Sequence, residues 1–428
     1  MILRTLALAT CLSLAVAAGA APARPASLTV VCGAIAESYE PCRSGSEAWA
    51  AARGHEVRIL RYGGTVPQNR ATLAQLLEIG DRQVDVVEVE AAWVSTIQAH
   101  LVDLRPRLGR DLSDSFATAV LSFTRDGEVL AAPWFVGVGR LFYRADLLAK
   151  HGLAVPRTWE ELAASARTIQ EAERSGGAQG FSGFLWPGKV SESLTVDAIE
   201  WTASRGVPPI LGPDGRPTVT DPRVAVALSQ AASWVGTISP GDVLEMDDRE
   251  AVRRFMAGEA AFLRYWSTGS TTFRAEGGTV AGHVAAATLP AGDGAGGRYT
   301  SVLGGFGLGV SRYAQQPDLA LDLIRWLTSA DAQRARALAL QGDPTLPALY
   351  EDPQLVQLRP DYPELRSAFE AAVLRPLNRA GRNYPRISGE FAAAVHRILE
   401  QSVEPQAELA QLQQLLERLA GSAVGRAS

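Results

Sequence analysis

The chain has 428 residues, more than one hydrophobic core usually supports, so we expect two domains of ordinary size. Hydrophobic residues make up 47% of the sequence and charged residues 20%, which is the balance of a globular protein. The formal net charge is −5 and no basic run occurs, so nucleic acid and anionic membrane surfaces are disfavoured as partners.

Residues 1–26 have the pattern of a secretory signal peptide. Arg4 supplies a short basic region, an apolar run covers residues 6–18, and small residues follow it. The apolar run is shorter than the about 20 residues that a membrane-spanning helix needs. The pattern therefore predicts export to the periplasm with cleavage between Ala20 and Ala26.

Three cysteines occur in the sequence, and Cys11 lies in the predicted signal segment. A lipid-attachment site at Cys11 is disfavoured because the apolar run before it is too short. Cleavage leaves Cys32 and Cys42, and two cysteines in an exported protein usually pair. We expect a Cys32–Cys42 disulfide worth at most about 3 kcal/mol, because the loop is short. A metal site is disfavoured, since the five histidines are scattered and none lies near these cysteines.

The mature chain opens with strands and helices in alternation, as in a doubly wound α/β domain. The predicted strands are SLTVVCG (27–33), HEVRILRY (55–62) and VDVVEVEAAW (84–93), and the helices between them are EAWAAARG (47–54) and a segment around 70–77. Ligands of such sheets bind beyond the carboxyl ends of the strands. Glu90 and Trp93 lie at one of these ends.

The middle of the chain begins with a strand at 129–135 that runs into Gly137 and Gly139, where we expect a crossing from one lobe to another. Thr158 is predicted to cap the next helix, with Glu161 three residues on. From 223 to 262 the pattern is helical. The remaining predicted elements are strands around a glycine-rich loop (282–311) and helices at 319–338, 388–401 and 407–420.

Several stretches, found together in one order, carry a family likeness. They include CGAIAESYEPC, LAAPWFVGVGRLFYRADLLAKHGL, GFLWPGK, FMAGEAAFLRYW and SVLGGFGLGVSRYA. Together they resemble an extracellular solute-binding protein of an ABC sugar importer, in the maltose- and trehalose-binding family and closest to its trehalose/α-glucoside branch. The resemblance covers nearly the whole mature chain.

The resemblance implies an α/β protein with the type II periplasmic-binding-protein fold, in which two α/β lobes are joined by a hinge and the ligand cleft lies between them. The implied N-terminal lobe comprises 27–137 and 288–342, and the C-terminal lobe comprises 138–287 and 343–428. The implied function is capture of a disaccharide or α-glucoside and delivery to the ABC permease subunits. Such a receptor is a monomer, needs no cofactor and catalyses no reaction.

Two alternatives remain open. The same fold could bind a polyol or a glycerol-phosphodiester derivative, although phosphate recognition would require clustered cations, and the candidates are Arg70, Arg264 and Arg375. A secreted glycoside hydrolase would also combine tryptophans with acids. Hydrolysis needs two carboxylates at a fixed separation, one of them with a raised pKa.

The resemblance and the pairing of aromatic with charged residues predict a ligand-binding set. A pyranose ring stacks on an aromatic face, and its hydroxyls bind charged or bidentate partners. Trp266 resembles the family's stacking residue, and Arg264 lies two residues back on the same strand face. The Arg375 guanidinium is expected to donate paired hydrogen bonds to sugar hydroxyls. The predicted set is Glu37, Tyr39, Arg70, Glu90, Trp93, Trp134, Trp186, Asp248, Arg264, Trp266, Gly304, Gly305, Phe306 and Arg375.

Packing, or a solvated surface charge, is the alternative for every member of this set. Four further tryptophans have the spacing of packed helical residues: Trp159, Trp201, Trp234 and Trp326. The chain also departs from its relatives at four positions. The relatives carry Glu where this chain has Ser38, Asp or Asn where it has Gly137, Asn where it has Tyr265 and Trp where it has Phe306. A hydrogen bond from a charged group is worth about 1.5–3 kcal/mol, so these departures predict weakened trehalose binding unless other groups compensate.

Overall fold

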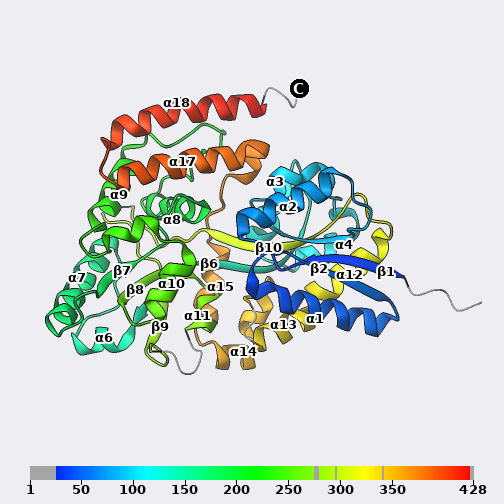
Figure 1. Ribbon diagram of the computed structural model, residues 1–428, viewed down its shortest axis with the longest axis horizontal. Helices are drawn as coiled ribbons and strands as arrows, with labels where there is room; N and C mark the ends of the chain where they lie inside the picture. The colour runs from blue at the N-terminus through cyan, green and yellow to red at the C-terminus, as the bar shows by residue number, and fades with distance from the viewer. Residues whose placement is uncertain (1–25, 274–278, 295, 340–341, 425–428) are drawn as a thin grey trace, which may run out of the picture.

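The computed structural model describes residues 26–273, 279–294, 296–339 and 342–424. Two halves lie side by side, each with strands at its centre and helices outside (Figure 1). Apart from Ala26, the predicted signal segment lies outside the described residues. None of the described helices combines the length and the apolar character that a membrane crossing requires.

One twisted sheet runs through both halves. Its strands, with the β4–β5 hairpin that stands apart from it, are β1 (Ser27–Cys32), β2 (Glu56–Arg61), β3 (Val86–Glu90), β4 (Thr124–Arg125), β5 (Glu128–Val129), β6 (Ala132–Arg144), β7 (Ser182–Leu185), β8 (Ala260–Trp266), β9 (Val284–Thr288) and β10 (Leu303–Val310). The order is β2-β1-β3-β10-β6-β8-β7, and β9 also pairs with β6. β1 is parallel to β2 and β3, whereas β10 is antiparallel to β3 and β6. This α/β architecture confirms the predicted fold class.

Strand β6 passes through both halves and positions the candidate site. From Ala132 to Val138 it pairs with β10, and from Gly139 to Arg144 it pairs with β8 and β9. The partner changes next to Gly137, where the sequence places a lobe boundary. How the rest of the chain divides between the lobes stays a prediction.

The helices form the outer layers of both halves (Figure 1). Around the β2-β1-β3-β10 half lie α1 (Ala36–Arg53), α2 (Val66–Glu78), α3 (Val94–Ile97), α4 (Arg105–Ser113), α5 (Ala117–Ser122), α12 (Pro317–Thr328) and α13 (Ala330–Leu338). Around the β6-β8-β7 half lie α6 (Ala145–Lys150), α7 (Trp159–Ser175), α8 (Glu192–Ala203), α9 (Pro222–Trp234), α10 (Asp248–Met256), α11 (Gly269–Thr272), α16 (Leu377–Ala380), α17 (Tyr384–Leu399) and α18 (Pro405–Val424).

Two more helices follow, and the second packs on the crossing strand. They are α14 (Pro353–Leu358), which contacts α13, and α15 (Tyr362–Glu370), which contacts α5 and β6. The short 3-10 helices are η1 (Gln98–His100), η2 (Gly241–Glu245), η3 (Pro347–Glu351) and η4 (Gly381–Asn383).

Helix boundaries follow the local signals in the sequence at two of the predicted positions. The Thr158 side chain accepts a hydrogen bond from the Glu161 amide at 3.2 Å and so caps α7, as predicted. Gly54, with φ of 69°, ends α1 in the left-handed conformation that glycine adopts without steric cost.

The helical pattern predicted over 223–262 is wrong at its end. Helix α10 ends near Gly258, whose φ is 81° and whose amide bonds back to the Phe255 carbonyl. The next residues, from Ala260, form β8 because they pair with β6. Apolar residues of a short buried strand cannot be told from a helix by their periodicity alone.

The Cys32–Cys42 disulfide is present, with a Cα–Cα distance of 5.8 Å, and confirms the predicted pairing. It joins the carboxyl end of β1 to helix α1. Trp159, Trp201 and Trp234 are at most 2% exposed and pack in one core, as predicted. Trp326 is partly buried against a second core on α12.

Candidate functional site

Helix α8 supplies acids to two arginine centres at the junction of the halves. Its first turn carries Glu192, and Ser193, Asp197 and Glu200 follow at the four- and three-residue spacing that places side chains on one helix face. The Ser191 side chain caps the helix by accepting the Leu194 amide at 3.4 Å. Helix α8 is otherwise rich in apolar residues, and its acids point in two directions. Glu192 belongs to one arginine centre, and Asp197 and Glu200 belong to the other.

The first centre surrounds Arg264 on β8. Its Nε and Nη2 donate to the two carboxylate oxygens of Glu200 at 2.8 and 2.7 Å, and its Nε lies 2.9 Å from Asp197 Oδ1. The residue is 1% exposed. Burial opposes its charge, but the neighbouring Glu200 and Asp197 outweigh burial and raise the pKa of Arg264. This paired geometry holds the guanidinium in one plane.

Asp197 is incompletely satisfied in this centre, as is Nη1 of Arg264. Its side chain is fully buried, and neither carboxylate oxygen has a hydrogen-bond partner among the described residues. Burial raises the pKa of Asp197 well above its usual range against the Arg264 charge, and Glu200 and Asp248 add to the rise. Asp248 accepts a hydrogen bond from Ser193 Oγ, and its charge also helps to raise the pKa of Arg264.

Trp266 ends β8, two residues after Arg264. The Arg264 guanidinium carbon lies 4.6 Å from the centroid of the indole, a cation–π contact that covers one ring face. Trp266 is only partly buried, unlike most tryptophans of the chain. Its indole is therefore held on one face by Arg264 and remains partly accessible at the junction.

The second centre surrounds Arg375, which joins acids of both halves. Its Nη2 donates to Glu90 Oε1 at the end of β3 at 2.5 Å, and its Nη1 donates to Glu192 Oε1 on α8 at 2.8 Å. Tyr384 Oη and, at 2.6 Å, Ser388 Oγ on α17 also donate to Glu192. Burial disfavours the Arg375 charge, but Glu90, Tyr384 and Glu192 raise its pKa well above the usual value.

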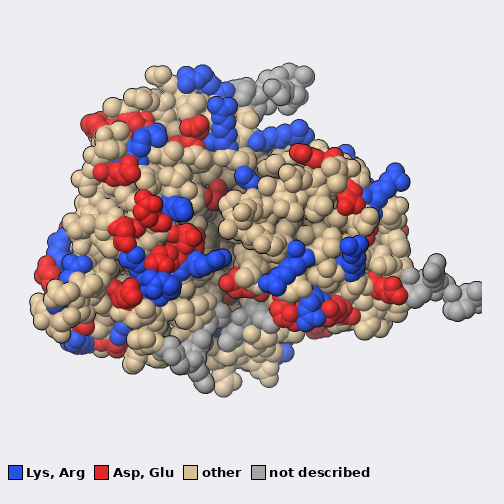
Figure 2. Space-filling model, in the orientation of Figure 1, with Lys and Arg blue, Asp and Glu red and all other residues tan. Residues whose placement is uncertain are grey.

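Charged side chains also gather on the surface around this junction. Figure 2 shows a furrow between the halves and a group of acidic side chains over the region of α8 and α10. Burial, followed by the charges of Asp248 and Glu37, raises the pKa of Tyr265. Glu37 on α1 therefore lies close enough to act on a residue of β8 in the other half.

The structure brings part of the predicted set together at the junction. This part is Glu37, Glu90, Asp248, Arg264, Trp266, Gly304, Gly305, Phe306 and Arg375. Phe306 stacks on Phe135 with ring centroids 4.9 Å apart. Tyr39 is partly exposed and its ring lies under Arg61 at 4.3 Å, and Arg70 is partly exposed on α2.

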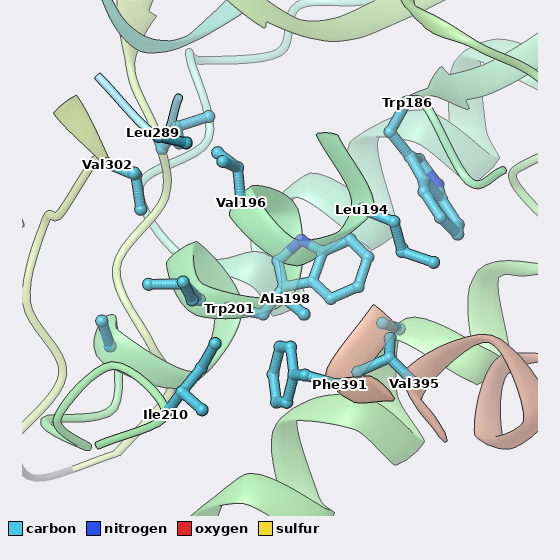
Figure 3. Close-up of a cluster of buried hydrophobic side chains, with 14 of the residues drawn as sticks. Trp186, Leu194, Val196, Ala198, Trp201, Ile210, Leu289, Val302, Phe391 and Val395 are labelled. Carbon is cyan, nitrogen blue, oxygen red and sulfur yellow. The ribbon is translucent and has the colours of Figure 1, made fainter. Parts of the chain in front are cut away.

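Trp93, Trp134 and Trp186 are not brought to this surface. Trp186 is fully buried, donates to Ser239 Oγ at 3.0 Å and packs edge-on against Trp201 at 5.2 Å, within the cluster of Figure 3. Trp134 is also fully buried, and Trp93 is 4% exposed. A buried indole offers no face to a ligand, so the placement of these three residues corresponds to packing.

The set predicted from the sequence lacks the acids of α8 and their partners on α17. Glu192, Asp197 and Glu200 lie in one helix, and Tyr384 and Ser388 have the four-residue spacing of one helix face. Charged residues at regular spacing in an apolar helix are the signal that could have identified them. Among the described residues, no group of three or more His, Cys, Asp or Glu is arranged to hold a metal ion.

Comparison with known proteins places this geometry in context. Residues 44–334 match the family model of bacterial extracellular solute-binding proteins. A probable ABC transporter-binding protein of Deinococcus radiodurans is 35% identical over 406 residues, which cover 94% of this chain and 96% of that protein.

Two solved structures extend the comparison. Maltose-bound MalE3 of T. maritima has a TM-score of 0.83 and 28% identity, covering 92% of this chain and all (100%) of that one. A solute-binding protein of Agrobacterium radiobacter K84 in complex with ribitol has a TM-score of 0.76 and the same coverage of 92% and 100%. At 22% identity, this second likeness shows the fold alone.

Proposed function

This chain belongs to the bacterial extracellular solute-binding proteins, and from that premise we propose that it is the receptor of an ABC sugar importer. It captures a neutral disaccharide or α-glucoside of the maltose or trehalose class between its two lobes, outside the cytoplasm. It then delivers the sugar to the membrane permease. The solved structure of the T. maritima relative, which holds maltose, supports this class of ligand.

The observation that carries the proposal is the partly exposed Trp266 at the junction, with arginine–carboxylate groups beside it. An indole face suits the apolar face of a pyranose ring. The carboxylates of Glu90 and Asp248 suit its hydroxyls, because hydrogen bonds to charged groups are the stronger ones. The combination is typical of a site that holds a carbohydrate by stacking and hydrogen bonding.

The charge balance favours a neutral ligand over a phosphodiester. Arg264 faces Glu200 and Asp197, and Arg375 faces Glu90 and Glu192. A phosphodiester would have to displace one of these buried or half-buried carboxylates. The displaced carboxylate would then lose its partner, which is costly in a poorly solvated site. A sugar hydroxyl can instead donate to a carboxylate that remains paired.

The burial of acids with a raised pKa argues against a glycoside hydrolase. Such an enzyme needs a carboxylic acid with a raised pKa in contact with the glycosidic oxygen. Burial raises the pKa of Glu88 to about 7, opposed by hydrogen bonds from Ser38 and backbone amides, and burial likewise raises the pKa of Asp197. Both side chains are fully buried, so neither acid meets the surface where a substrate would lie.

A thermal-shift screen tests the ligand class. Maltose, trehalose, ribitol and a glycerol phosphodiester are added separately to the mature protein. A ligand stabilises the native state by RT ln(1 + [L]/Kd), so the true class raises the melting temperature in a concentration-dependent way. We expect a rise with a disaccharide. A rise with the phosphodiester alone, or release of glucose from maltose, contradicts the proposal.

Trp266→Ala tests the stacking role. Truncating an aromatic anchor costs about 2 kcal/mol or more, so affinity for the disaccharide is expected to fall about thirtyfold by calorimetry. Trp326→Ala is the matched control, because Trp326 is also partly buried and has Arg53 at 5.8 Å over its ring. We expect this control to keep its affinity. Equal losses in both variants would exclude a specific role for Trp266.

A further inference from the structure

The indole of Trp266 rests against a strand of the other half. Gly304 on β10 lies opposite Gly137 on β6, and both face this indole. A Cβ on Gly304 would lie 2.7 Å from Cζ3 and 2.9 Å from Cη2 of Trp266. Protein Cβ atoms do not approach this closely, so an alanine at 304 would force a shift.

Gly137 makes the same kind of contact with more space. A Cβ on Gly137 would lie 3.7 Å from Cε3 of Trp266 and 3.6 Å from Ser267 Oγ, which is ordinary van der Waals contact. Neither glycine has the positive φ that would itself favour glycine. Close approach of the indole, rather than backbone conformation, therefore disfavours a larger residue at 304.

The Trp266–Gly304 contact crosses the point where β6 changes partner. Trp266 pairs with Gly139 through β8, whereas Gly304 belongs to β10, which pairs with β3. The indole is thus held on one face by Arg264 and at its benzo ring by the opposite half. A ring fixed from two sides loses little freedom when a ligand binds, and such preorganisation improves affinity.

We propose that Gly304 is a positioning residue that seats the Trp266 indole and so sets the aromatic surface offered to the ligand. The expected effect on ligand affinity rests on the proposed function, but the seat itself, which is the contact of Gly304 with the Trp266 indole, does not. In Gly304→Ala the atoms that must move are the far end of the Trp266 side chain. The indole is therefore displaced toward solvent while the strand pairing is kept.

The seat is tested first without ligand. All nine tryptophans lie in the described part of the chain, and those that are not buried are Trp266 and Trp326. In a Trp326→Phe background, acrylamide quenching therefore reports mainly on Trp266. We expect a clear increase in quenching in Gly304→Ala and none in Gly137→Ala. Unchanged quenching in Gly304→Ala overturns the proposal, as does an equal increase in both variants.

A double-mutant cycle then tests positioning against a general structural effect. Maltose is the probe, and Gly304→Ala is expected to weaken its binding about tenfold, whereas Gly137→Ala changes it little. If Gly304 acts through the indole, the Gly304→Ala effect disappears in a Trp266→Ala background, because the coupling is between two touching residues. Persistence of the full loss in that background overturns the proposal.

The two measurements separate failure of this inference from failure of the proposed function. If maltose and the other disaccharides do not bind, the proposed function fails, and the ligand-free quenching still decides whether Gly304 seats Trp266. If maltose binds to all variants equally, the proposed function stands and the positioning role of Gly304 is overturned.

Discussion

The two arginine centres at the junction differ in where their partners come from. Arg264 takes Glu200 and Asp197 from one helix, α8, which packs in the same half as β8. Arg375 takes Glu90 from β3 in one half and Glu192 from α8 in the other. Both guanidiniums face two carboxylates, yet only the second arrangement spans the halves.

Burial follows the same division. The side chains of Glu200 and Asp197 are 1% and 0% exposed, whereas those of Glu90 and Glu192 are 12% and 38% exposed. Rotation of the halves would leave the Arg264 centre intact but would separate the acids that Arg375 joins. We therefore infer that Arg264 belongs to the stable fold, and that Arg375 belongs to the particular arrangement of the lobes.

The largest expected effect comes from removing the cation of the first centre. Arg264→Met leaves Glu200 and Asp197 buried together without their cation, which is expected to cost about 3–5 kcal/mol of unfolding free energy. Denaturant unfolding measures this cost. Arg53→Met is the control, because Arg53 forms an exposed pair with Asp322 whose loss should change stability little. Similar losses in the two variants would remove the distinction between buried and exposed centres.

Glu88 can be compared with the acids of the two arginine centres, because it is a buried acid that is held by backbone amides. Gly33 and Ala34 donate to its Oε2 at 2.6 and 3.2 Å, and burial raises its pKa to about 7. In the unfolded chain the acid loses its proton near its ordinary pKa of 4.5, so wild-type stability should fall as pH rises from about 4.5 to 7.

Glu88→Gln is expected to remove this fall, which amounts to about 3 kcal/mol at most. Melting temperatures measured from pH 4.5 to 8 provide the test, with the exposed Glu56→Gln on β2 as control. The difference between Glu88→Gln and wild type should grow up to about pH 7 and then stay constant. A difference that is independent of pH contradicts the buried, protonated state of Glu88.

The smallest effect on stability is expected at the second centre. In Arg375→Ala, Glu90 keeps the Ala92 amide at 2.7 Å, and Glu192 keeps Tyr384 and Ser388. Glu90 and Glu192 are 12% and 38% exposed and can be rehydrated, so the unfolding free energy should fall by less than in Arg264→Met. The lobes should open, however, and small-angle scattering of the ligand-free variant should show a larger radius of gyration. An unchanged radius would mean that other contacts hold the lobes together.

Much of the fold could be predicted because its signals are local. Gly54 ends α1 and Thr158 caps α7 through groups within a few residues, and these contacts form wherever the helix forms. The helical prediction failed at β8, where pairing with β6 decides between helix and strand for a short apolar run. A single-sequence pattern carries little information about that pairing.

The candidate site likewise contains residues whose placement could be predicted from the sequence and residues whose placement could not. Trp266 and Arg264 could be paired from their two-residue spacing on a strand, and the structure brings them into contact at 4.6 Å. Trp186 has an equally suggestive sequence context beside a proline and a glycine, yet its indole lies fully buried against Trp201. Exposure depends on which elements cover a residue, so it could not be predicted from neighbours in the chain.

The sequence by itself determined the alternating α/β elements of the first part of the chain, the end of α1, the start of α7 and the Cys32–Cys42 pair, because each depends on residues close together in the chain. Tertiary structure alone decided that Glu90 and Glu192 share Arg375, and that Trp266 meets Gly304. Arg375 lies 285 and 183 positions from Glu90 and Glu192 in the sequence, and Trp266 lies 38 positions from Gly304. They meet because β6 carries the chain between two packed halves, and no local propensity encodes which side chains that crossing brings together.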